Sequence, residues 1–173
     1  MANKVNGLEN QMLEAEIQAE IVAEILVEIK TEVEKEIKGK PILGFTDKET
    51  VKLDFDDKSF KTAKYWAFRA DKRFRLDGFV ILKSSEKHYH IVFDREVSWE
   101  KNLSIVGWVA VCSRSEELLR WLAMQCIKGA STLRVGMKDD KPSPRIVFCH
   151  GKQDCQIKSF LNYRKIIKGI QAW

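Results

Sequence analysis

The fold follows from one stretch of the chain, Gly78-Phe-Val-Ile-Leu-Lys-Ser-Ser-Glu-Lys-His-Tyr-His-Ile-Val-Phe93. Two runs rich in β-branched and aromatic residues, 78–83 and 89–93, stand on either side of a polar segment. Such residues favour strands, and the polar segment from Ser84 to Lys87 is short enough to be a tight turn. The stretch therefore predicts a β-hairpin.

Further strands and helices are predicted on both sides of this hairpin. Residues 40–49 are rich in turn-forming residues and are expected to be a linker. Ser98 and Ser115 stand before apolar runs and are expected to cap helices, the second of which ends at Gly129. The other predicted elements are strands over 51–55, 132–138 and 145–150 and helices over 58–74, 98–112, 117–127 and 153–169. The order β-α-β-β-α-α-β-β-α predicts an α+β domain in which helices cover an antiparallel or mixed sheet.

The N-terminal segment, residues 1–40, has a different pattern. It contains neither glycine nor proline between Leu8 and Lys38, and isoleucine and glutamate each recur every four residues. This spacing predicts a long amphipathic helix. Because a helical turn has 3.6 residues, a row of isoleucines at every fourth position shifts gradually around the helix, which disfavours a regular heptad coiled coil. The helix either packs on its own domain or assembles with another copy or a partner. We therefore expect an acidic helix over 1–40 and an α+β domain over 41–173.

The composition sets limits on the class of protein. The chain has 173 residues, 45% of them hydrophobic and 32% charged, which fits one compact domain with an appendage. No apolar run is long enough for a membrane span, and no secretory signal is recognisable. The four cysteines then indicate a reducing cytoplasm. The net charge of +5 is the sum of −4 in residues 1–40 and +9 in residues 41–173, and a basic domain attracts phosphate backbones or nucleotides.

Two aspartates at the end of the first predicted strand are candidate metal ligands. Asp54 and Asp56 are two residues apart in Leu53-Asp-Phe-Asp-Asp57, so both side chains should lie on one side of the strand. Carboxylates this close repel each other unless a cation lies between them. A divalent ion such as Mg²⁺ or Mn²⁺ is the natural partner. The alternative is an acidic turn in which Asp57 caps the next helix.

Basic and hydroxyl side chains form a second group of candidates. The hairpin turn carries Ser85, Lys87, His88 and His90, and the two histidines share one side of the strand. Arg134, Lys138 and Arg145 follow in the predicted C-terminal strands. Guanidinium and ammonium groups are typical phosphate ligands, although each of them can also be a solvated surface charge.

Taken in order, these motifs resemble the catalytic core of the archaeo-eukaryotic primase superfamily. Leu53-Asp-Phe-Asp56 is similar to the family's hDhD strand, and Ser85-Glu-Lys-His-Tyr-His-Ile-Val-Phe93 is similar to its S-G-x-G-x-H-h-h-h hairpin. Thr132-Leu-Arg-Val-Gly-Met-Lys138 is similar to its arginine strand and the lysine that follows.

The resemblance implies an RRM-like palm sheet and nucleotidyl transfer in DNA replication, in a plasmid or a virus given the small size. It implies two divalent ions on Asp54 and Asp56, with His90 as a further catalytic residue. The nucleoside triphosphate would contact Ser85, His90, Arg134 and Lys138, and single-stranded DNA or a primer-template would be the partner.

The same comparison leaves a non-enzymatic alternative open. Glu86 and His88 replace the glycines of the family's hairpin, and residues 123–130 contain no carboxylate where the family has its third acid. Asp94 and Asp139 are the nearest acidic residues. A protein that has lost a metal ligand in this way is expected to bind nucleic acid or to act as an assembly subunit.

A second enzymatic alternative rests on His88-Tyr-His90. This pattern of two histidines around a hydrophobic residue resembles the metal motif of rolling-circle replication endonucleases, which use a later tyrosine as nucleophile. Tyr163 lies on the last predicted helix and would take that role. The family's lysine four residues after the tyrosine is replaced by Ile167.

Overall fold

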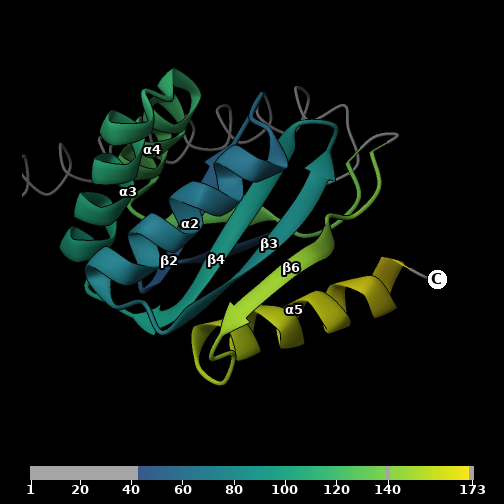
Figure 1. Ribbon diagram of the computed structural model, residues 1–173. Coiled ribbons are helices and arrows are strands. Elements are labelled where there is room, and N and C mark those ends of the chain that lie inside the picture. The colour runs from purple at the N-terminus through teal and green to yellow at the C-terminus, as the bar shows by residue number, and fades with distance from the viewer. Residues whose placement is uncertain (1–42, 139–140, 172–173) are drawn as a thin grey trace, which may run out of the picture. The chain divides into compact units, whose positions relative to one another are not determined.

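The computed structural model describes residues 43–138 and 141–171 (Figure 1). The predicted N-terminal helix and the domain boundary at residue 40 lie outside these residues and stay predictions. Within the described ranges the chain is α+β, with four helices and antiparallel sheets, which confirms the predicted class. None of the described helices is long and apolar enough to cross a membrane.

A four-stranded antiparallel sheet is the central element of the structure. Its strands, in spatial order, are β2 (Thr50–Phe55), β4 (His88–Glu96), β3 (Gly78–Ser85) and β6 (Arg145–Gly151). The predicted hairpin is formed by β3 and β4, with Glu86 and Lys87 as a two-residue turn. Lys87 has a φ of 57°, as tight hairpin turns require. Helix α2 (Phe60–Phe74) connects β2 to β3 while β4 lies between these strands, which makes a split βαβ unit.

A strand that the sequence analysis missed lies in the segment predicted to be a linker. Residues Gly44–Asp47 form β1, which pairs with β5 (Ser131–Arg134) in a separate two-stranded sheet. The linker prediction was therefore wrong at these positions, and the strand predicted over 132–138 ends at Arg134. The observed order places one strand before the predicted β-α-β-β-α-α-β-β-α. The pairing partner of β1 is distant in sequence, so no local pattern indicates the strand.

A buried lysine joins the small sheet to the large one. Lys52 has no exposed surface, and its Nζ donates to Asp47 Oδ1 at 3.0 Å and to the carbonyl and hydroxyl oxygens of Ser131, each at 2.9 Å. Asp47 and Ser131 are register partners in β1 and β5. Burial lowers the pKa of Lys52, and the Asp47 carboxylate opposes that shift. A buried ammonium group needs partners of this kind, so Lys52 fixes the position of the small sheet.

Serine side chains begin three of the helices. Ser98 and Ser115 accept hydrogen bonds from backbone N–H groups of the first turns of α3 and α4, which confirms both predicted caps. Ser59, and not Asp57, does the same for α2. Gly129 ends α4 in the left-handed conformation, as predicted. The bounds of the remaining helices are Trp99–Ser113 for α3, Glu116–Lys128 for α4 and Gln156–Gln171 for α5.

Side-chain alternation gives the four-stranded sheet two different faces. The first face packs against α2, α3 and α4 and is apolar; from β2 it includes Val51, Leu53 and Phe55. The second face packs against β5 and α5, and Val80 and Val92 belong to its apolar part. The alternate residues of β2 therefore lie on the second face together with the alternate residues of β4, among them Lys52, Asp54 and His90.

Candidate functional site

The candidate site begins near the end of β2, next to β4. Asp54 and His90 are register partners in these two strands. The distance from Asp54 Oδ1 to His90 Nε2 is 3.4 Å, and the two side chains are 23% and 6% exposed, respectively. An aspartate of the first predicted strand and an imidazole of the hairpin thus come together as the sequence indicated. Their catalytic roles stay predictions.

A second carboxylate–imidazole pair lies closer to the end of the two strands. Asp56 Oδ1 is hydrogen-bonded to His88 Nδ1, and the side chains are 48% and 37% exposed. The backbone N–H of Lys58 donates to the Lys87 carbonyl oxygen at 3.0 Å, which ties the segment after β2 to the hairpin turn. The sheet therefore presents a buried pair and, next to it, a more exposed pair of the same chemical types.

Arg134, at the end of β5, contacts the same end of the hairpin. Its NH2 nitrogen donates to the hydroxyl oxygen of Ser84 at 2.6 Å and to the Ser84 carbonyl oxygen at 3.2 Å. Its NH1 nitrogen donates to the carbonyl oxygens of Gly136 and Pro142 at 2.9 and 3.0 Å. All these acceptors are neutral, so they hold the guanidinium in place without cancelling its charge.

The surroundings shift the pKa of Asp54 and of His90 in opposite directions. Burial, followed by the charge of Asp56, raises the pKa of Asp54 to about 7. Burial, followed by the charge of Arg134, lowers the pKa of His90 to about 4. At neutral pH the Asp54 carboxyl is therefore divided between its two protonation states, while the His90 imidazole is neutral. An added cation would favour the ionised form of Asp54.

The oxygen atoms of Asp54 indicate whether Asp54 and Asp56 suit a divalent metal. Asp54 Oδ1 is buried and accepts no hydrogen bond, which is unusual for a buried polar atom. Among the residues that the structure describes, no three His, Cys, Asp or Glu side chains form a ready-made metal centre. Mg²⁺ commonly takes only one or two carboxylates from the protein and completes its shell with substrate phosphates and water. Asp54 and Asp56 fit such a partial ligand set.

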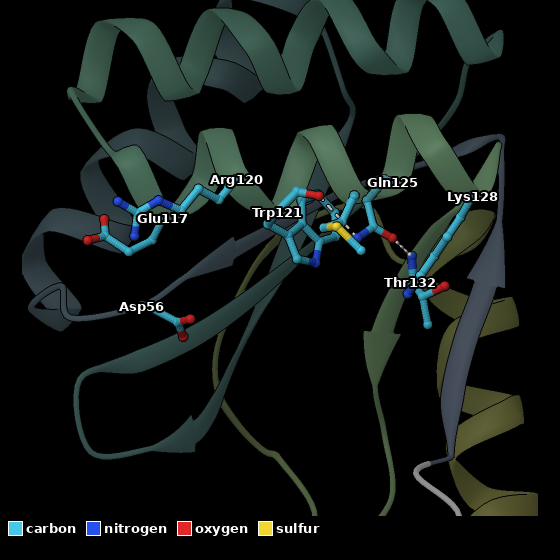
Figure 2. A pocket seen from close by; sticks show the side chains of 8 residues that line it. Asp56, Glu117, Arg120, Trp121, Gln125, Lys128 and Thr132 are labelled. Carbon is cyan, nitrogen blue, oxygen red and sulfur yellow. Dashed lines mark hydrogen bonds between the residues drawn. The ribbon is translucent and has the colours of Figure 1, made fainter. Parts of the chain in front are cut away.

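A groove of about 510 Å³ opens beside Asp56 (Figure 2). One wall is α4, and Figure 2 shows Asp56 across the groove from the Arg120 and Trp121 side chains of this helix. The Gln125 side chain donates to the Trp121 carbonyl oxygen at 3.1 Å and accepts from the Thr132 backbone N–H at 2.9 Å, so it ties α4 to β5. The full lining combines charged, polar and apolar side chains: Asp56, Glu117, Arg120, Trp121, Met124, Gln125, Lys128 and Thr132. This mixture suits a ligand with both an anionic and an apolar part.

The remaining predicted phosphate ligands lie elsewhere around the hairpin. Ser85 and Arg145 line a separate cavity of about 300 Å³. Lys87 is exposed at the hairpin turn, and Lys138 is exposed after β5. Five of the predicted site residues therefore interact with one another in the described structure: Asp54, Asp56, His88, His90 and Arg134.

Asp94, one of the two acidic residues considered as a third carboxylate, has a structural role. It is buried, and its Oδ1 accepts the backbone N–H groups of Cys155 and Ile157 at 3.1 and 3.0 Å. Its Oδ2 accepts the N–H of Asp154 at 3.2 Å. Asp94 therefore caps the start of α5 from strand β4, and its oxygens are already engaged. Asp139 lies outside the described residues.

Tyr163, the predicted nucleophile of the endonuclease alternative, contacts β1. Its hydroxyl group donates to the Gly44 carbonyl oxygen at 3.1 Å, and its ring lies 5.6 Å from the Phe45 ring. These contacts give Tyr163 a packing role between α5 and the small sheet. The nucleophile role stays a prediction.

Sequence reasoning missed Ser84 and several residues of α4. Ser84 binds Arg134, and the alternation Val80, Leu82, Ser84 could have indicated this face. Arg120, Met124 and Lys128 of α4 line the groove without belonging to any motif. Which face of α4 lies next to the site depends on tertiary packing, so no local signal identifies them.

No protein family, curated protein or solved structure matches this chain.

Proposed function

We propose that this protein is a primase- or polymerase-like nucleotidyltransferase of DNA replication, which uses a divalent metal and nucleoside triphosphates. The observation that carries the proposal is the buried Asp54 Oδ1, which accepts no hydrogen bond although Asp56, His90 and Arg134 lie around it. A buried carboxylate oxygen that accepts no hydrogen bond destabilises the folded protein. A hard cation is the partner that suits two adjacent carboxylates.

In this proposal Asp54 and Asp56 hold Mg²⁺ or Mn²⁺ through their carboxylate oxygens. When bound there, the metal supplies activation of a hydroxyl nucleophile and neutralisation of charge on the phosphates. Asp54 must release its proton to act as a ligand, and its pKa of about 7 makes that release depend on pH in the neutral range. His90 is neutral in the same range and lies against Asp54, so it restricts the position of the carboxylate.

The groove beside Asp56 supplies the contacts that a nucleoside triphosphate needs. Arg120 and Lys128 complement the negative charge of phosphates, while Trp121 and Met124 offer a surface for the base. Arg134, held rigidly by neutral acceptors, stabilises negative charge that develops near Asp54.

The split βαβ unit of β2, α2, β3 and β4 supports the RRM-like palm that the resemblance implies. The fourth strand differs from that expectation. An RRM-like sheet has its fourth strand beside the first, whereas β6 pairs with β3 at the other edge. The proposal therefore depends on the positions of Asp54 on β2, Asp56 just after β2 and His90 on β4, and not on the complete sheet order.

The test is a template-dependent extension assay with the full chain, labelled nucleotides and either Mg²⁺ or Mn²⁺. We expect incorporation by the unmodified protein and a loss on the order of 100-fold or more in Asp54→Asn and Asp56→Asn, since each loses a negative ligand. Asp57→Asn is the matched control, because Asp57 is exposed and its φ of 57° is a conformation that asparagine tolerates. This control should retain full incorporation.

Two results contradict the proposal. Equal incorporation by the unmodified protein, Asp54→Asn and Asp56→Asn would show that the carboxylates have no catalytic role. No incorporation with either metal, together with metal-independent binding of single-stranded DNA, would instead support the non-enzymatic alternative. The lack of a carboxylate in residues 123–130 is the observation that favours that alternative.

A further inference from the structure

A second groove, of about 540 Å³, is lined by residues of β6, of α5 and of the segment between them. Strand β6 is at one edge of the four-stranded sheet and β2, which carries Asp54, is at the other. The lining is basic and contains no carboxylate: Ile146, Gln153, Lys158, Leu161, Asn162, Arg164, Lys165 and Lys168. We call this feature the β6–α5 groove.

Helix α5 divides its residues between two sides. Ile157, Phe160 and Ile167 are buried in the second apolar cluster and attach the helix to the sheet. Lys158, Lys165 and Lys168 line the groove, at spacings of seven and three residues that place them along one side of a helix. Helix α5 has no acidic residue over Gln156–Gln171, so these charges have no carboxylate partner on their own helix.

Arg164 adds a buried cation to the same groove. The residue is only 7% exposed, and it donates through NH2 to the Pro144 carbonyl oxygen. Its Nε has no hydrogen-bond partner, and burial lowers its pKa. A buried guanidinium bonded only to a neutral carbonyl is costly for the folded protein unless an anion lies close to it. The buried charge of Arg164 therefore favours a negatively charged ligand in the groove.

We propose that the β6–α5 groove binds the phosphate backbone of a single-stranded nucleic acid, independently of the metal site. From Lys158 to Lys168 the helix rises by about 15 Å, a length that fits several consecutive phosphates better than one isolated anion. Ile146 and Leu161 give the groove an apolar side, which unpaired bases can contact and paired bases cannot. The β6–α5 groove is at the sheet edge opposite β2, so a strand bound there is held away from Asp54.

The experiment measures fluorescence anisotropy of a labelled 20-nucleotide single-stranded DNA with the full chain in EDTA, over a range of KCl concentrations. The test variant carries Lys158→Gln, Lys165→Gln and Lys168→Gln. We expect its affinity to fall at least about tenfold at low salt, and the slope of log K against log[KCl] to decrease by about 2, at ~0.7 for each lost phosphate contact. Lys48→Gln, Lys61→Gln and Lys101→Gln is the control, which removes three exposed charges elsewhere and should change affinity less than about threefold.

Thermal melts by circular dichroism establish that both triple variants are folded. Equal losses in the two variants would show a general charge effect and would overturn the proposal. So would an absence of binding by the unmodified protein, equal affinity for a duplex of the same sequence, or preferential binding to anionic vesicles. Because EDTA removes divalent ions and nucleotides are absent, the result does not depend on the nucleotidyl-transfer proposal, and either can fail alone.

Discussion

The two faces of the four-stranded sheet come from alternate residues of the same strands, yet they differ in chemistry. The first face, under α2, α3 and α4, is an apolar cluster in which Leu53, Phe79 and Ile91 have no exposed surface. The second face has a smaller apolar cluster against α5, and ionisable side chains such as Asp54 and His90 lie on it. Burial of apolar area stabilises a fold, whereas burial of ionisable groups destabilises it. The first face therefore supplies stability, and the second supports a function that needs charged groups in partial burial.

The largest effect that this comparison predicts is on the apolar face. Phe79→Ala should lower the free energy of unfolding by about 3–5 kcal/mol, because it leaves a cavity in a fully buried cluster. The Phe79 ring lies 5.0 Å from the Phe68 ring and 5.9 Å from the Phe148 ring. Urea unfolding followed by circular dichroism measures the change. Phe79→Leu, which keeps most of the apolar volume, should cost less, and a loss below about 1 kcal/mol in Phe79→Ala would refute the role given to this face.

A smaller effect, dependent on pH, is expected on the second face. The pKa of Asp54 is about 7 in the folded protein against a usual value of 3.8, so the folded state binds this proton more tightly. The free energy of unfolding then falls as pH rises from about 4 to about 7, by on the order of 3–4 kcal/mol from this group. Asp54→Asn should remove that fall, and chemical unfolding at pH 4, 6 and 8 measures it.

His90 should act in the opposite direction. Its pKa is about 4 when folded against 6.5 ordinarily, so the unfolded chain binds more protons and the free energy of unfolding rises from pH 4 to about 6.5. The two contributions oppose each other in the unmodified protein. Asp54→Asn should therefore leave a stability that increases with pH, and His90→Gln one that decreases. If both variants follow the pH profile of the unmodified protein, the two groups are not buried as described.

The smallest predicted effect concerns the charge of Arg134. Its guanidinium lowers the pKa of both Asp54 and His90, so Arg134→Gln should raise both values. NMR titration of the His90 ring protons and the Asp54 side-chain carbon measures the shifts. Arg145→Gln removes an exposed arginine from the cavity that contains Ser85 and should leave both pKa values unchanged. Equal shifts in the two variants would mean that the second face responds only to net charge.

The sequence predicted part of this second face correctly. Asp54 of the first predicted strand lies next to His90 of the hairpin because β2 pairs with β4. The short turn fixes the register of β3 with β4 alone, so the β2–β4 pairing comes from the tertiary structure. The role of Ser85 as a phosphate ligand stays a prediction. The contact of Ser84 with Arg134 was not predicted, and the strand register shifts between Lys83 and Ser85. Such a shift is not visible in residue types alone.

Contacts between residues far apart in sequence were not predicted. Asp94, one of the acidic residues nearest to the position of the missing third carboxylate, accepts three backbone N–H groups at the start of α5, about 60 residues away. Residues 40–49 looked like a linker, but β1 within them pairs with β5. The residues next to a side chain in sequence do not show whether that side chain contacts a distant segment of the chain or a ligand.

The sequence by itself determined the α+β class, the hairpin and the serine caps at the starts of α3 and α4. These features depend on periodicity and on hydrogen bonds within a few residues, so local residue types are sufficient. Only the tertiary structure decided that β6 lies at the β3 edge, that Lys52 joins two sheets and that α4 forms a groove beside Asp56. These arrangements are selected by the packing free energy of segments distant in sequence, which no local pattern encodes.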